Sequence, residues 1–500
     1  MEALDEMFGV TEAGSTVETE LKAGLSTFLT MAYILLVNPS MLSVTGIPFE
    51  DALFATAVAA FVGCMVMAFW AKLPFALAPG MGLNAYFAFT VAAPWAMAIP
   101  WEIALAAVLV EGVLFLILSL PAVGWRTKMI NSIPTDLKIA TGAGIGMFLA
   151  IIGLREMGWV AHDNATLVTL GETGSWTYES GELWAMVGLI AIAIMMARGI
   201  KGAIIYGILA VSVIGWGLSV SDPYNQGYAV INFCFENDAG ETVCDYTSDF
   251  VAGVAGRGTA EAPTEIFGFV GMPEETLGAA LSALGDIGGT DGTSLGAFLL
   301  VMITFLFVDI FDTAGTLYSV GRQAGYVDEN DELMNSDEAF MSDAAATIVG
   351  AAIGTSTTTT YIESAAGIEE GGKTGLTAAT VGVLMLSGLF FSDLFASIPQ
   401  YAMACALVVV GALMMRQAAD INWADSDVAI PAFLTMVMMP FMYSIAVGIA
   451  WGVIVYVVMK IGQGKMDELN TVMLILAALL AMFYLGPGSE TTFEWLIGDL

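Results

Sequence analysis

Three of the carboxylic acids inside apolar stretches of the sequence are candidates for chemistry, because an ionised side chain is costly there. Asp309 and Asp312 lie three residues apart among Phe, Val and Ile, and Glu363 follows a run of threonines. Residues three apart on a helix lie on neighbouring faces, so the two aspartates are predicted to share one side of a helix. Acids buried in this way can hold a proton or accept hydrogen bonds from a polar ligand. We predict a functional role for Asp312 and Glu363, while Asp309 is either a direct ligand or proton carrier, or an acid bonded to neighbouring backbone.

Neutral polar residues complete the candidate site. Asn84 can both donate and accept hydrogen bonds, and Tyr361 either stacks on a flat ligand or packs in the core. The Thr30 hydroxyl lies one turn from Thr27 and either faces the same site or bonds to its own helix. The remaining acids of the apolar stretches are interpreted as structural or interfacial: Glu111, Asp343 and Asp393.

The stretches that carry Asn84 and Glu363 are interrupted at matching places. Residues 78–84 contain Pro79 and two glycines, and residues 354–363 contain a run of Ser and Thr. Proline removes a backbone donor, glycine favours non-helical dihedrals and β-branched threonine favours extended chain. Both segments are therefore predicted to be locally extended, which membrane proteins tolerate only where such backbone is buried or lines a wet cavity. Two matching breaks point to one central site.

The composition requires a membrane around these elements. The chain has 500 residues, of which 57% are hydrophobic and 13% charged, against about 25% charged in soluble domains. Apolar runs of roughly 20 residues, enough to cross about 30 Å of hydrocarbon, recur along most of the chain. The predicted spans are 24–44, 52–71, 76–93, 102–120, 137–155, 183–198, 203–220, 296–320, 342–354, 357–368, 375–392, 399–415, 427–441 and 444–461, with a further apolar run at 470–486.

An odd number of spans in each half predicts an inverted repeat, because the second set of seven then enters the membrane in the opposite direction. The expected fold is an all-α polytopic membrane protein of the 7+7 inverted-repeat transporter class with broken third and tenth spans. The expected segments are a cytoplasmic tail (1–23), a first repeat (24–220), an acidic external linker or cap (221–293), a second repeat (294–465) and an extra C-terminal helix and tail (466–500).

The distribution of Lys and Arg predicts the orientation. If the N-terminus is cytoplasmic, most basic residues fall in cytoplasmic loops, as the positive-inside rule requires. We therefore expect a multi-pass protein of the cell membrane. This orientation puts His162, the only histidine, in an external loop, and also puts Cys234 and Cys244 outside, where they either form a disulfide or remain two free thiols.

The charge balance and the missing motifs exclude several classes. With 49 Asp and Glu against 14 Lys and Arg, nucleic acid is not an expected partner. The acidic surface favours a halophilic source over an acidic member of an ordinary family. No metal-ligand cluster, Walker loop or dinucleotide fingerprint is present, so no cofactor or metal is expected and the chain is not predicted to be an enzyme. An intramembrane aspartyl protease is disfavoured because Asp309 and Asp312 share one helix.

Four segments resemble the AzgA-type adenine, guanine and hypoxanthine permeases, a branch of the nucleobase/ascorbate (xanthine/uracil) transporters. These segments read GLSTFLTMAYI (24–34), APGMGLNA (78–85), FDTAGTL (311–317) and TYIESAAG (360–367). The resemblance implies a core domain of spans 1–4 and 8–11, a gate domain of spans 5–7 and 12–14, an elevator-like movement and a homodimer. It implies proton symport of a purine nucleobase, with substrate contacts at Asn84, Asp312 and Glu363.

A purine also suits the residues themselves, because its ring N–H and amine donors and ring-nitrogen acceptors match carboxylates beside an amide. We expect Asn84, Thr30, Asp312, Tyr361 and Glu363 to contact the base, and Asp309, Asp312 and Glu363 to couple proton movement. A sulfate-permease-like anion carrier and a xanthine/uracil carrier on the same fold remain alternatives. Two buried acids disfavour an anion, and the resemblance disfavours uracil, because this chain has Thr316 where uracil-type relatives have a histidine. Na⁺ remains open as the coupling ion, and the preferred purine is not determined by the sequence.

Overall fold

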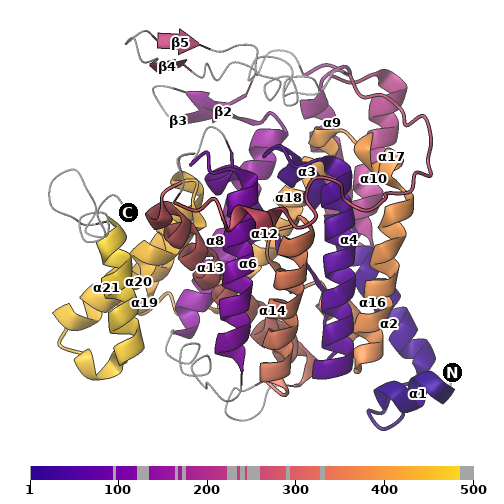
Figure 1. Ribbon diagram of the computed structural model, residues 1–500. Coiled ribbons are helices and arrows are strands. Elements are labelled where there is room, and N and C mark those ends of the chain that lie inside the picture. Colours follow the sequence, from indigo (N-terminus) through magenta and orange to yellow (C-terminus); the bar gives the residue numbers. More distant parts are fainter. Residues whose placement is uncertain are drawn as a thin grey trace. The chain divides into compact units, whose positions relative to one another are not determined.

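The computed structural model describes a largely helical protein over residues 2–93, 97–120, 134–163, 167–171, 176–221, 234–236, 242–244, 259–288, 293–326 and 333–484. The predicted helical fold class is confirmed, since each predicted span coincides with a helix or with a strand followed by a short helix. Six helical segments within the described residues are long and apolar enough to cross a membrane, and shorter apolar helices accompany them. The helical chain is traced from indigo to yellow in Figure 1.

The elements before the linker are α1 (Glu2–Phe8), α2 (Val17–Met31), α3 (Ile34–Ser43), α4 (Phe49–Val66), β1 (Leu77–Pro79), α5 (Met81–Tyr86), α6 (Trp101–Ser119), α8 (Thr135–Glu156), β2 (Val160–Asp163), β3 (Leu167–Leu170), α9 (Gly181–Ala197) and α10 (Ala203–Leu218). Short π-helical turns extend α4 over Met67–Ala71 and α5 over Phe87–Val91. Both predicted breaks are present, because β1 precedes α5 and a matching strand precedes α15.

The later elements are β4 (Cys234–Glu236), β5 (Thr242–Cys244), α12 (Ala279–Ala283), α13 (Leu295–Ala324), α14 (Ser336–Ile353), β6 (Thr358–Thr360), α15 (Ser364–Glu369), α16 (Gly375–Met385), α17 (Ser392–Ala396), α18 (Gln400–Met415), α19 (Ser426–Phe441), α20 (Ile445–Gly462) and α21 (Thr471–Tyr484). Helix α21 is the predicted extra C-terminal helix.

The chain divides into two compact units. The first comprises residues 1–149, 269–390 and 411–500, and the second comprises residues 150–268 and 391–410. Within the first unit α6 packs on α13 and α14, while α4 packs on α14 and α16; Figure 1 shows α4, α14 and α16 side by side. Small residues permit this packing: a Cβ at Gly63 of α4 would lie 2.8 Å from the Ala346 Cβ of α14. Within the second unit α9 packs on α10, and the Cys405 thiol donates to the Ala185 carbonyl over 3.2 Å.

Part of the predicted external linker is ordered on the first unit. The Asp51 carboxylate at the start of α4 accepts hydrogen bonds from the backbone N–H groups of Glu275 (3.0 Å) and Thr276 (3.1 Å). The Thr276 hydroxyl donates to the Ile353 carbonyl at the end of α14, and α12 packs on α6. The segment between Phe269 and Gly288 is therefore attached to the ends of three helices.

Strands β4 and β5 pair in the antiparallel direction, with the Cα of Cys234 opposite that of Cys244. The side chains of these cysteines, and that of His162 in β2, lie outside the described residues. The disulfide therefore stays a prediction.

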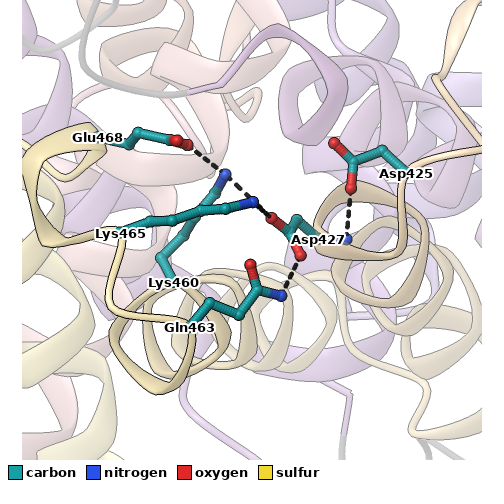
Figure 2. Close-up of polar contacts among 6 residues, drawn as sticks. All are labelled: Asp425, Asp427, Lys460, Gln463, Lys465 and Glu468. Atoms are coloured by element: carbon teal, nitrogen blue, oxygen red, sulfur yellow. Dashed lines mark hydrogen bonds and ion pairs between the residues drawn. The ribbon is translucent and has the colours of Figure 1, made fainter.

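A polar network closes one end of the α19–α20 hairpin (Figure 2). The Asp427 carboxylate accepts hydrogen bonds from Lys465 (2.5 Å), Lys460 (3.4 Å) and Gln463. Lys460 also donates to Glu468 over 2.5 Å. The Asp427 and Lys460 side chains are only 3% and 8% exposed, so these charges are buried as a mutually compensated group.

Candidate functional site

The two broken elements meet as a short antiparallel ladder. Strand β1 pairs with β6, with Leu77 opposite Thr360 and Pro79 opposite Thr358. The ladder continues at both ends, because the Gly80 N–H donates to the Thr357 carbonyl over 2.8 Å and the Tyr361 N–H donates to the Ala76 carbonyl over 2.9 Å. These bonds satisfy extended backbone that membrane lipid cannot hydrate. Helices α5 and α15 begin directly after the strands, so both helix starts lie near the crossing.

The glycines of the first break permit the close approach of the second. A Cβ at Gly80 would lie 2.8 Å from the Thr359 hydroxyl oxygen, and a Cβ at Gly82 would lie 2.5 Å from a methyl carbon of Ile145. A side chain at either place would therefore displace its neighbour. Gly315 behaves differently: a Cβ there would meet no atom of the described residues within 4 Å, so no other backbone approaches it closely.

Asp343 of α14 holds the strand β6 in place. Its carboxylate accepts from the Thr360 N–H over 3.0 Å and from the Thr360 hydroxyl over 2.9 Å. One turn along the same helix, the Thr347 hydroxyl bonds to both the N–H and the carbonyl of Thr358. This arrangement agrees with the structural role predicted for Asp343, because the carboxylate satisfies backbone and hydroxyl donors within the protein.

Acids and tyrosines cluster around the crossing. The Tyr33 hydroxyl donates to the Glu363 carboxylate over 2.6 Å, and the Tyr361 hydroxyl donates to the Pro79 carbonyl over 2.5 Å. Tyr361 also lies in the electrostatic field of Glu363 and Asp312, and the Thr359 hydroxyl lies beside the Asp312 carboxyl. Asp312 and Glu363 are half-buried, so both acids keep accessible surface. The structure therefore brings together three of the predicted residues: Asp312, Tyr361 and Glu363.

Tyr33 was not singled out from the sequence as a site residue. Its only signal was its position within the motif at residues 24–34, and its partner Glu363 is remote in the chain.

Asn84 and Thr30 have contrasting environments. Asn84 of α5 is fully buried, and neither its amide oxygen nor its amide nitrogen has a hydrogen-bond partner among the described residues. Such a group is costly unless a ligand or water completes it. The Thr30 hydroxyl instead bonds to its own helix, at the carbonyls of Thr27 (2.7 Å) and Ser26 (3.3 Å).

Asp309 accepts no hydrogen bond from the backbone of the crossing among the described residues. It is fully buried on α13, and one carboxylate oxygen accepts from the Thr313 hydroxyl over 3.1 Å. The acid that acts on it most strongly is Glu111 of α6, which is also fully buried. The sequence predicted a structural or interfacial role for Glu111, and no local signal pairs it with Asp309, which is on a distant segment.

No group of three or more His, Cys, Asp or Glu side chains could hold a metal ion within the part of the chain that the structure describes. The chemistry that the acids of the site offer is that of hydrogen-bond acceptors and proton carriers.

Comparison with known proteins gives full-length matches. A family model for the xanthine/uracil permeases, described as "Permease family", matches residues 18–226 and 291–451. The chain is similar to the guanine/hypoxanthine permease PbuO of Bacillus subtilis, with 38% identity over 95% of this chain and 98% of that protein. It is also similar to the adenine permease AdeP of Escherichia coli, with 36% identity over 96% of this chain and 95% of that protein.

A solved structure shares the fold at low sequence identity. The transmembrane domain of a cyanobacterial bicarbonate transporter matches with a TM-score of 0.58 at 12% identity, over 87% of this chain and 97% of that domain. This likeness concerns the fold alone, and it confirms the predicted 7+7 transporter architecture.

Proposed function

The chain belongs to the xanthine/uracil permease family, and from this premise we propose that it imports purine nucleobases by proton symport, with an elevator-like movement of a core domain against a gate domain. The observation that carries the proposal is the cluster of Tyr33, Asp312, Tyr361 and Glu363 at the crossing of β1 and β6. The names of two full-length relatives, a guanine/hypoxanthine permease and an adenine permease, support the same substrate class.

The cluster has the chemistry that a purine needs. Two carboxylates accept hydrogen bonds from the ring N–H and exocyclic amine of a purine. A side-chain amide can accept from the same donors and can donate to the ring nitrogens. Tyr33 fixes the Glu363 carboxylate through a 2.6 Å hydrogen bond. The side-chain amide of Asn84 is buried and has no hydrogen-bond partner among the described residues. We propose that it forms the third hydrogen-bonding contact with the base. An aromatic face is available at Tyr361.

The remaining parts of the proposal concern the protein in its membrane. The N-terminal tail is cytoplasmic, residues 24–220 and 294–465 form the two repeats, and the functional unit is a homodimer in the bilayer. Thr30 is the weakest of the proposed substrate contacts, because its hydroxyl is already bonded within α2. The likeness to a bicarbonate transporter does not favour an anion substrate, since two half-buried acids would repel one.

Equilibrium binding tests the substrate class directly. Purified protein in lipid nanodiscs is incubated with radiolabelled hypoxanthine and an excess of unlabelled adenine, guanine, xanthine, uracil or sulfate. The proposal predicts displacement by purines and none by sulfate, and predicts weakened binding for Asp312→Asn and Glu363→Gln. Displacement by sulfate, or unchanged purine affinity in both variants, would contradict it.

A further inference from the structure

Two fully buried acids on neighbouring helices have three carboxylate oxygens without a hydrogen-bond donor among the described residues. Both oxygens of Glu111 and one oxygen of Asp309 have no hydrogen-bond donor among the described residues, and neither side chain has any exposed surface. The helices that carry them, α6 and α13, pack directly on each other. The carboxyls are close enough for a side-chain hydrogen bond between them, which requires a proton on one of the two.

No positive charge in the described part of the chain compensates this pair. The ion pairs found among the described residues join side chains near helix ends, and none of them includes Glu111 or Asp309. The second Asp309 oxygen accepts only the neutral Thr313 hydroxyl. Two ionised carboxylates side by side in a dry interior would each lack solvation and would repel each other. A single shared proton removes one charge and forms an O–H···O hydrogen bond.

The other titratable groups around the pair already have contacts of their own. On α13 and α14, Asp312 lies beside Thr359, and Asp343 accepts two hydrogen bonds from Thr360. Helix α12 carries no titratable residue, and the Tyr86 ring of α5 packs edge-to-face on Phe305 of α13. Glu363, at the start of α15, accepts from Tyr33. On α20, which also contacts α13, Lys460 is bound to Asp427 and Glu468.

We propose that the Glu111–Asp309 pair is the proton-holding site of the transport cycle, separate from the acids that contact the substrate. The pair takes up one H⁺ between a Glu111 oxygen and the free Asp309 oxygen when the site faces outward, and it releases that H⁺ to the inside. No other bond changes. This inference rests on the proposed proton symport, and it reassigns the coupling role from Asp312 and Glu363 to Glu111 together with Asp309. The substrate-facing acids stay near enough to feel the charge of the pair, since Asp312 acts electrostatically on Asp309.

Proteoliposomes that separate binding, exchange and proton-driven accumulation test this site. Glu111→Gln keeps the shape and a hydrogen-bonding group but cannot carry the shared proton. We expect hypoxanthine binding and counterflow exchange to persist in Glu111→Gln, with loss of accumulation driven by an inward proton gradient and loss of purine-dependent acidification reported by a trapped dye. Asp309→Asn is expected to show the same split, and Glu111→Asp is expected to restore accumulation in part.

Controls distinguish a proton role from a structural one. Ser119→Ala removes a different buried and unpartnered polar group from the same helix, and it is expected to retain accumulation. Accumulation at the wild-type level in Glu111→Gln would overturn the inference. If both Glu111→Gln and Asp309→Asn lose binding and exchange together, the pair is structural and the inference is overturned. This holds whether the two variant proteins fold or not. Wild-type purine uptake driven by Na⁺ without acidification would instead refute the proposed proton coupling.

Discussion

The Asp427 network and the Glu111–Asp309 pair bury acids in opposite ways. Asp427 is 3% exposed and accepts from Lys460, Lys465 and Gln463. Glu111 and Asp309 are fully buried and have no cationic partner in the described part of the chain. A compensated carboxylate stays charged and fixes the local structure, whereas an uncompensated pair becomes stable only by binding a proton. The difference separates structural acids from acids that can change state during transport.

Breaking the compensated network is expected to cause the largest loss of stability. Asp427→Ala removes the acceptor that Lys460, Lys465 and Gln463 share and leaves Lys460 with Glu468 alone. It should lower the unfolding temperature, because a buried charge that loses a partner is costly. Thermal unfolding in detergent followed by tryptophan fluorescence measures the change. Glu468→Gln is the comparison variant: the Glu468 side chain is 48% exposed, so water can replace part of its contact with Lys460 and the expected loss is smaller. Equal unfolding temperatures for the two variants would show that the network is not structural.

The acids that we propose to contact the substrate form a third class, in which loss is expected to affect binding more than stability. Asp312→Asn and Glu363→Gln are each expected to weaken purine binding by about 10- to 100-fold, as for the loss of a hydrogen bond to a charged group. Both acids are half-buried, so the unfolding temperature should change little. Isothermal calorimetry measures the purine affinity and thermal unfolding measures the stability, so the two methods together separate a loss of binding from a loss of stability. A variant that unfolds early and binds normally would place its acid in the structural class.

The crossing of the broken elements can be tested through its glycines. Gly82→Ala places a methyl group against Ile145 and is expected to cost about 1–3 kcal/mol through overpacking. Gly315→Ala is the matched control, because its Cβ meets no atom within 4 Å. Alanine has the higher helix propensity, so Gly315→Ala should stabilise α13 by up to about 1 kcal/mol. Thermal unfolding of the two variants in parallel gives the comparison, and a loss as large in Gly315→Ala would contradict the described packing.

The smallest expected effect is the pH dependence of the compensated network. The hydrogen bond to Asp427 raises the pKa of Lys465 above its usual value of 10.5. A contact that raises a lysine pKa in the folded protein stabilises the fold fully at pH values below the pKa of that lysine in the unfolded chain. The stabilisation is lost as the pH rises through the pKa of the lysine in the folded protein. The difference in unfolding temperature between wild type and Lys465→Met should therefore stay constant from pH 7 to pH 9 and shrink only above pH 10.5. A difference that shrinks near pH 7 would exclude this account of the contact.

Local sequence signals predicted the spans and both breaks. Apolar run length located the helices, and Pro79, Gly80 and the threonine run located the two extended segments, because proline, glycine and β-branched residues disfavour a helix wherever they occur. The pairing of β1 with β6 was not predicted, since it depends on the tertiary approach of segments from the two halves of the chain.

The partners of single residues depended on tertiary contacts. The neighbour of Glu111 is on α13, the donor to Glu363 is Tyr33 on the first span, and Asp51 accepts from a backbone N–H group of the predicted linker. Acids of the same residue type in similar apolar runs therefore have different roles, which depend on the groups that the fold places beside each carboxylate.

Uptake of radiolabelled hypoxanthine by cells that lack their own purine carriers tests the central claim most directly. Cells that express the protein are assayed at two pH values, with Na⁺ present or absent, with an uncoupler and with unlabelled purines, uracil or sulfate as competitors. The account predicts saturable uptake that purines block, that an uncoupler abolishes and that does not require Na⁺. Correctly inserted protein that shows no purine-blocked uptake would contradict it.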